Sequence, residues 1–209
     1  RLNFIRIIKM KKYTSEQSGR SMIEMLGVLA IVGVLSVAGI AGYSKAMAKY
    51  KVNKLVDQVS TVAANVRTTF AAQGNYKGLD SETAYKLGIF PEETVKDCAE
   101  GFNPYSCIHH AMGGAISVYS SGDYSFDLGV DTLSKNACAA LVSADWGSAS
   151  SFVGILDASA SVDDPAEDAV GGDVAYSASD IKGNLMSVIS NICDCKNDKQ
   201  NCVFALRFK

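Results

Sequence analysis

Two hydrophobic patterns follow each other in the first third of the chain. No residue from Met25 to Tyr43 is charged, and these 19 residues would form a helix about 28 Å long, enough to cross the core of a bilayer. Residues 44–72 contain no proline, and their apolar side chains recur every three or four positions. These positions are Val52, Leu55, Val56, Val59, Val62, Ala63, Val66 and Phe70.

Together the two patterns predict one continuous helix from Ser21 to Ala72, ended by Gly74-Asn75. Its first half is apolar all round, which is typical of a membrane-spanning segment, and its second half is amphipathic, which is typical of packing on a globular domain. The polar residues Lys49, Lys51, Lys54, Asp57, Gln58 and Arg67 are expected mostly on the faces away from that domain. Glycines at 27, 33, 39 and 42 permit close helix packing or local melting.

Shorter elements are expected after this helix. Gly114–Ser120 and Tyr124–Val130 alternate in polarity around Ser121-Gly122-Asp123 and predict a hairpin. Short helices are expected from Asp80 or Ser81 to about Leu87, from Ser134 to Ala144, and from Ala178 or Asp180 to near Ile192. An edge strand is expected at Phe152–Leu156 and a last strand at Asn201–Phe208. The fold class is therefore α+β, with a long N-terminal helix packed on an antiparallel sheet.

Trp146 and the aromatic residues Phe126, Phe152, Phe204 and Phe208 are expected in the core of the globular domain. Several serines are present, but the sequence contains no Gly-x-Ser-x-Gly elbow and no phosphate-binding glycine loop. We therefore expect no catalytic residues, no enzymatic activity and no cofactor.

The net charge of −2 conceals an asymmetry. Residues 1–19 carry five Lys and Arg residues and one Glu, a net charge of +4, whereas the rest of the chain carries 15 basic and 21 acidic residues, a net charge of −6. A basic segment before an apolar span keeps the N-terminus in the cytoplasm and sends the remainder across the membrane. The acidic composition of the exported part is not typical of a nucleic-acid-binding protein.

All six cysteines lie after the apolar span, so disulfides are expected if that part is exported. Six cysteines allow 15 pairings, and sequence alone does not fix the connectivity. We favour Cys98–Cys107, Cys138–Cys193 and Cys195–Cys202. Exchanging Cys193 with Cys195 is a nearly equal alternative.

Two groups of residues resemble metal ligands. His109-His110 follows Cys98 and Cys107, but the spacing is not that of a zinc ribbon or finger, and we expect loop histidines and a disulfide. Residues 157–173 form an acidic loop that could attract calcium, although the spacing is not that of an EF-hand and a solvated loop is the simpler interpretation. The acidic residues are Asp157, Asp163, Asp164, Glu167, Asp168 and Asp173. We therefore predict no metal site.

The N-terminal motif is more specific than either group. Gly19 is followed five residues later by Glu24, and then by Ala30 and Gly33 in a run rich in Ile, Val and Leu. This arrangement resembles the signal of type IV prepilins. The resemblance implies cleavage by a membrane peptidase between Gly19 and Arg20 and methylation of the new terminus. It also implies that Glu24 neutralises the terminal amine of Arg20 on a neighbouring subunit.

Features further along the chain resemble type IVb pilins in particular. They are the leader, the series Leu79, Ala84, Gly88 and Pro91, the hairpin, the helix with Cys138, and a cysteine before the last strand. The resemblance implies a leader at 1–19, a transmembrane and filament-core helix at 20–43 and an exported domain at 44–209. It implies a structural pilus subunit, held as a single-pass protein in the inner membrane and then assembled into an extracellular homo-oligomeric helical filament. A prepilin peptidase and a pilus assembly machinery are the implied partners.

Three other interpretations remain open from the sequence. A pseudopilin of a type II secretion system shares the same N-terminal motif, and a calcium-binding acidic loop would favour it. A membrane-anchored exported enzyme or binding protein would need a functional constellation in residues 75–209. An ordinary secretory signal would be shorter than residues 1–43 and followed by a clear cleavage site, although Ala41 and Gly42 are small.

Overall fold

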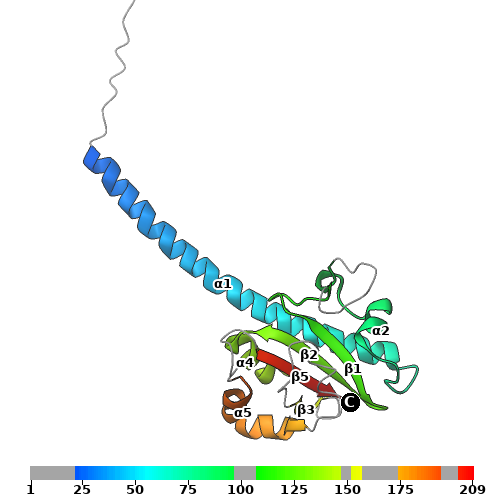
Figure 1. Cartoon of the computed structure of the whole chain (residues 1–209). Helices are drawn as coiled ribbons and strands as arrows, with labels where there is room; N and C mark the ends of the chain where they lie inside the picture. Colours follow the sequence, from blue (N-terminus) through cyan, green and yellow to red (C-terminus); the bar gives the residue numbers. More distant parts are fainter. Residues whose placement is uncertain (1–21, 97–106, 147–151, 157–173, 194–201) are drawn as a thin grey trace, which may run out of the picture. The chain divides into compact units, whose positions relative to one another are not determined.

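The computed structural model describes residues 22–96, 107–146, 152–156, 174–193 and 202–209. The chain divides into two units, Arg1–Lys45 and Ala46–Lys209, and the boundary falls within helix α1, Met22–Phe70 (Figure 1). The single long helix expected from the hydrophobic pattern is confirmed. Gly74, at a φ of +72°, follows the helix, and its backbone N–H donates a hydrogen bond of 3.0 Å to the Phe70 carbonyl.

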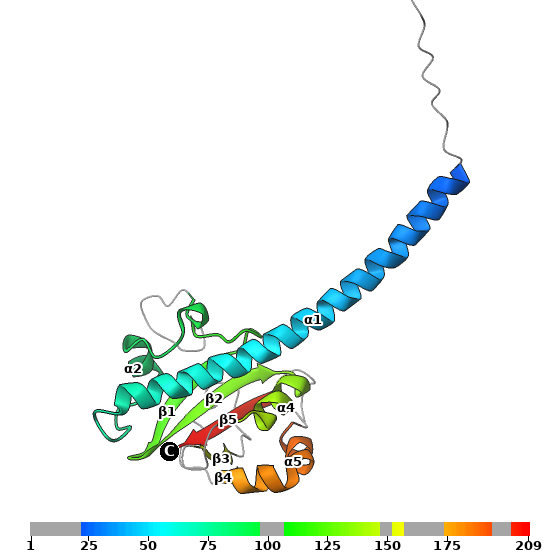
Figure 2. The ribbon, with the colours of Figure 1, turned by 180° about the vertical axis from the view of Figure 1, so that it is seen from behind.

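Within the second unit, α1 buries one stripe of apolar side chains. Leu55, Val59, Val62 and Val66 are fully buried, and Val52 and Val56 pack at the margin of the same cluster. Their spacing of three and four residues places them on one helix face, as the sequence predicts. Figure 2 shows this half of α1 crossing the strands β1 (Ile116–Gly122) and β2 (Ser125–Leu133).

The sheet of the second unit has five antiparallel strands. Besides β1 and β2 it contains β3 (Phe152–Leu156), β4 (Val174–Ser177) and β5 (Cys202–Phe208), in the spatial order β1-β2-β5-β3-β4. The last strand of the chain therefore lies at the centre of the sheet. The α+β class is confirmed.

Two details of the sheet differ from the sequence prediction. Strand β3 is not an edge strand, because β4, which the sequence did not predict, pairs with its free side. The hairpin turn also lies later than expected: Ser121 and Gly122 belong to β1, and Gly122 pairs directly with Ser125. A shift in register between Ser120 and Gly122 accommodates the extra residue in β1, so the turn consists of Asp123 and Tyr124.

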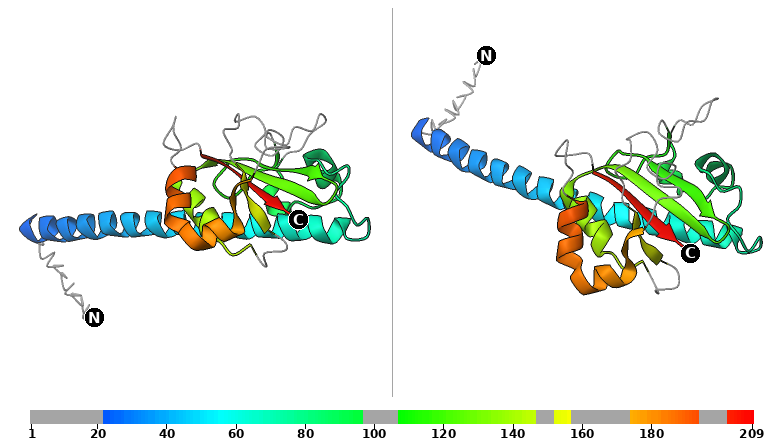
Figure 3. Two further views of the ribbon diagram at one scale, coloured as in Figure 1. Left: turned by 90° about the horizontal axis from the view of Figure 1, so that it is seen from below. Right: turned by 60° about the horizontal axis from the view of Figure 1, so that its bottom comes forward.

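The helices after α1 begin at capping residues. The Asp80 carboxylate accepts a hydrogen bond of 2.6 Å from the Thr83 N–H at the start of α2 (Ser81–Lys86), and Ser134 caps α4 (Lys135–Ser143) in the same way. Ser177 and Asp180 form a reciprocal capping box at the start of α5 (Ala178–Ile192). These helices were predicted, whereas the 3-10 turn η1 (Glu92–Thr94) was not. Figure 3 shows α4 and α5 together at one side of the sheet.

An aromatic cluster occupies the core between α1 and the sheet. The rings of Phe126 and Phe208 stack with centroids 5.2 Å apart, and Trp146 meets Phe208 edge-on at 6.0 Å. The indole N–H of Trp146 donates a hydrogen bond of 2.9 Å to the Leu141 carbonyl, which allows this polar group to be buried. The predicted core positions Phe126, Trp146, Phe204 and Phe208 are confirmed. The side chain of Phe152 lies outside the described part.

Candidate functional site: the exposed N-terminal helix

The apolar side chains of the first half of α1 are exposed, whereas the second half buries its apolar stripe. Every residue from Met22 to Ala46 is exposed, including Leu35 at 66% and Ile40 at 67%. Within the described residues, α1 is the helix whose length and composition would allow it to cross a membrane. An apolar surface of this extent in water is unfavourable, so it requires lipid or other protein as a partner.

Glu24 lies in the first turn of this helix and is exposed. It is the one charged residue between Met22 and Ser44. A carboxylate in the first turn is favoured by the free N–H groups and the positive end of the helix dipole. Gly19 and Arg20, the predicted cleavage residues, lie outside the described residues.

Four glycines in this segment have no packing role within the described residues of the chain. A Cβ added at Gly27, Gly33, Gly39 or Gly42 would meet no heavy atom within 4 Å. Each glycine in a helix interior costs about 0.5–1 kcal/mol relative to alanine. Nothing described in the chain offsets this cost.

The globular unit is covalently stapled by a disulfide between α4 and the end of α5. Cys138 and Cys193 are joined, with Cα atoms 5.7 Å apart and a sequence separation of 55 residues. This is the long-range bridge favoured from the sequence. Cys107 is also disulfide-bonded. The pairings Cys98–Cys107 and Cys195–Cys202 involve residues outside the described part and stay predictions.

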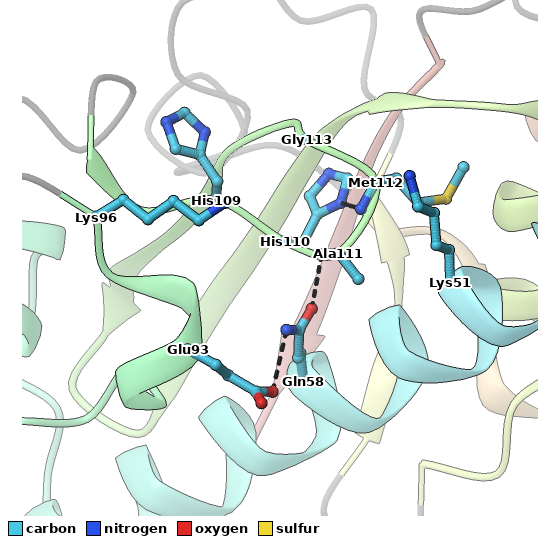
Figure 4. Close-up of a pocket in the computed structure, with 9 residues that line it drawn as sticks. All are labelled: Lys51, Gln58, Glu93, Lys96, His109, His110, Ala111, Met112 and Gly113. Atoms are coloured by element: carbon cyan, nitrogen blue, oxygen red, sulfur yellow. Dashed lines mark hydrogen bonds between the residues drawn. The ribbon is translucent and has the colours of Figure 1, made fainter. Parts of the chain in front are cut away.

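A second candidate is a polar cavity of about 280 Å³ between α1 and residues 107–114. Figure 4 shows Gln58 of α1 at its floor, with Lys51 and Lys96 at opposite sides. The Gln58 amide donates a hydrogen bond of 3.1 Å to Glu93 and accepts one of 2.9 Å from the Ala111 N–H. Lys54 approaches the same Glu93 oxygen at 2.7 Å, and this ion pair lowers the pKa of Glu93. Gln58 was expected on an outward face, and that prediction is wrong, because its amide is buried by these partners.

His110, beside this cavity, is held as a neutral imidazole. Its Nδ1 accepts a hydrogen bond of 3.1 Å from the Met112 N–H, so its proton resides on Nε2, which donates 2.9 Å to the Asp131 carbonyl. Burial lowers the pKa of His110. Gly114 allows this contact, because an added Cβ would lie 2.6 Å from His110 Nε2.

Two of the candidate groups beside this cavity are engaged in contacts within the fold. Both ring nitrogens of His110 are already hydrogen-bonded, and Cys107 is in a disulfide. Among the described residues, no three His, Cys, Asp or Glu side chains converge as a metal site would require. The acidic residues between 157 and 173 lie outside the described part.

A buried ion pair within the sheet escaped the sequence reasoning. Arg207 of β5 makes two hydrogen bonds of 2.7 Å to the carboxylate of Asp127 in β2. Burial raises the pKa of Asp127, and the Arg207 guanidinium counteracts that rise. Arg67, expected on an outward face, instead places its guanidinium 4.9 Å from the centre of the Phe208 ring. The alternation of polar and apolar residues in β5 is only a weak signal that Arg207 has a role. Nothing in the sequence identifies Asp127 as its partner.

An exposed apolar half-helix continuous with a helix packed on an antiparallel sheet defines a pilin-like subunit. Residues 45–186 match the family model described as Bundlin, which covers more than half of the chain. The chain belongs to the Bundlin family of type IV pilins and is a structural subunit of a pilus.

A solved structure is similar as well. It is TcpA, a type IV pilin from Vibrio cholerae El Tor biotype, with 16% identity over 76% of this chain and 98% of that chain, and a TM-score of 0.46. No curated protein matches the chain.

Proposed function

We propose that the chain is a prepilin that a prepilin peptidase cuts between Gly19 and Arg20. The mature subunit then resides in the inner membrane through residues 20–43, with residues 44–209 exported. The pilus assembly machinery extracts it into a helical filament in which the apolar half-helices bundle at the axis. The basic leader and the apolar span support this orientation.

One observation carries the proposal: the first half of α1 is exposed throughout although it is the most apolar part of the chain. In the membrane precursor, lipid would cover this surface. In the filament, the same surface of other subunits would replace the lipid. The four glycines would let neighbouring helices approach closely in the bundle.

Glu24 has a specific role in this bundle. A carboxylate surrounded by apolar helices costs several kcal/mol unless a positive charge pairs with it. Cleavage at Gly19 would create such a charge, the terminal amine of Arg20, four residues before Glu24 in the sequence. Pairing between Glu24 of one subunit and Arg20 of another would therefore fix the axial register of the filament.

The test compares Glu24→Ala with Glu92→Ala, a control that removes an exposed carboxylate from η1. Both variants should reach the membrane fraction at wild-type levels. Filaments sheared from the cell surface should be lost for Glu24→Ala, because each added subunit would bury an unpaired amine, and retained for Glu92→Ala. Normal filament yield from Glu24→Ala would contradict the pairing role.

Processing is tested separately by the intact mass of assembled subunits. The mass should correspond to a chain that begins at Arg20 with one added methyl group. Gly19→Ala should impair cleavage more than Ser18→Ala, since the peptidase must accommodate the backbone at the cut. Filaments made of subunits that retain residues 1–19 would refute the cleavage proposal.

A pseudopilin of a type II secretion system is the alternative that shares this membrane helix. It predicts that deletion blocks secretion of exported proteins and leaves surface filaments intact. The pilin proposal predicts loss of surface filaments with secretion preserved. Electron microscopy of the deletion strain, together with an assay of secreted protein, distinguishes the two.

A further inference from the structure

A run of lysines follows the apolar span of α1 and has no part in the assembly scheme above. Between Glu24 and Asp57 the charged residues are Lys45, Lys49, Lys51 and Lys54, with no acidic residue among them. At a helical rise of about 1.5 Å per residue, these lysines occupy about 14 Å of helix. They follow immediately after the uncharged segment that ends at Tyr43. This places four positive charges where a membrane helix would leave the hydrocarbon.

Lys49 and Lys51 differ from three other lysines of the globular unit, which are paired with carboxylates. Lys54, Lys77 and Lys86 each contact a carboxylate, at distances of 2.7, 3.2 and 2.6 Å. Lys49 and Lys51 are exposed, and among the described residues no carboxylate lies within ion-pair distance of either. Their charge is therefore available to a partner outside the chain.

Tyrosines accompany these lysines. Tyr43 and Tyr50 are 67% and 60% exposed. Tyrosine is enriched where membrane helices meet the headgroups, because its ring is apolar and its hydroxyl is polar. Lysine side chains reach along a helix toward the same region with their apolar stems in contact with lipid.

We propose that Lys49, Tyr50 and Lys51, together with the preceding Lys45, bind anionic phospholipid headgroups of the leaflet next to the globular domain. Phosphate oxygens satisfy the ammonium groups, and the tyrosine hydroxyl reaches the same layer. This contact holds the membrane-resident subunit at a defined depth, so extraction into a filament requires its release. The inference rests on the membrane residence stated under the proposed function.

The charge of the rest of the protein makes this local interaction distinctive. Residues 20–209 carry a net charge of −6, which opposes contact with an anionic surface. Salt screens charges over about 10 Å, so the lysines beside the surface act almost independently of distant acidic residues. Each basic residue at such a surface strengthens binding by about fivefold.

The experiment uses full-length protein reconstituted with a mixture of two vesicle populations, one of phosphatidylcholine and one containing phosphatidylglycerol. The distribution of protein between them is measured at low and high salt. Lys49→Gln/Lys51→Gln should reduce the preference for phosphatidylglycerol by about tenfold or more at low salt. Lys49→Arg/Lys51→Arg should retain it. Lys77→Gln/Lys86→Gln, with the same change in net charge, should also retain it.

Each outcome bears on a different claim. An equal loss of preference in both glutamine variants would reduce the effect to net charge and overturn the proposal, as would no loss in Lys49→Gln/Lys51→Gln. Reduced filament yield with unchanged lipid preference would mean that the lysines contact another subunit, which also overturns it. Failure of every variant to insert in either vesicle population would instead contradict the membrane residence on which the proposal rests.

Discussion

The two halves of α1 are both rich in apolar side chains, but they are covered in different ways. From Leu55 to Phe70, one stripe is buried against the sheet by the chain itself. From Met22 to Ala46, every residue is exposed, on all sides of the helix. A single sheet can cover one face of a helix, whereas a helix that is apolar all round needs partners on every side. The difference separates the part of the chain that folds from the part that assembles.

Removing the disulfide should have the largest effect on the folded half. Cys138→Ser together with Cys193→Ser releases a loop of 55 residues, which corresponds to about 4 kcal/mol of stability in the loop-entropy description. Urea unfolding of the globular unit, followed by tryptophan fluorescence of Trp146, should show this loss. An unchanged unfolding midpoint would mean that the staple contributes little to the folded half.

A pair of leucine variants makes the comparison direct. Leu55→Ala creates a cavity under the sheet and should reduce the free energy of unfolding by about 2–5 kcal/mol. Leu35→Ala removes the same atoms from an exposed position and should leave the free energy of unfolding within about 0.5 kcal/mol of wild type. Chemical denaturation measures the free energy of unfolding of both variants. A destabilising Leu35→Ala would show that the first half of α1 has a partner within its own chain.

The folded half should also respond to pH through His110. Its pKa is lowered in the folded protein, so the unfolded chain binds the proton more readily. Stability should be complete above the ordinary histidine pKa of about 6.5 and fall as the pH decreases below it. Urea unfolding at pH 7.5 and pH 5.0 measures the loss. His110→Gln should show a smaller difference between the two pH values.

The hydrophobic period and the caps were sufficient to predict most elements of the fold. The bounds of α1 follow from its apolar positions, and Ser134 and Asp80 mark their helices because a side-chain oxygen must accept the first free N–H groups. Strand β4 was not predictable, because four residues in a stretch rich in serine, alanine and glycine become a strand only by pairing with β3.

Polar contacts between residues that are far apart in the sequence could not be predicted from it either. Gln58 lies in the buried stripe, three residues after Leu55, but its partner is the N–H of Ala111, 53 residues away. Arg207 and Asp127 are 80 residues apart. The hydrophobic period of one helix or strand shows which of its faces is buried. It does not identify the polar group of another element that will contact that face.

The smallest effect on folding is expected from Gly33→Ala, and it gives the finest test of the comparison. The added Cβ meets no atom within 4 Å, and alanine favours the helix by up to about 1 kcal/mol, so the isolated subunit should be unchanged or slightly more helical. In a bundle, the same methyl group would separate helices that pack through small residues, and filament yield should decrease. Helicity by circular dichroism in detergent and sheared filament yield measure the two responses. Leu35→Ala, which removes side-chain atoms instead of adding them, is the matched control for a change in surface shape. If Gly33→Ala left filament yield intact, the glycine would serve local unwinding of the helix and not close packing.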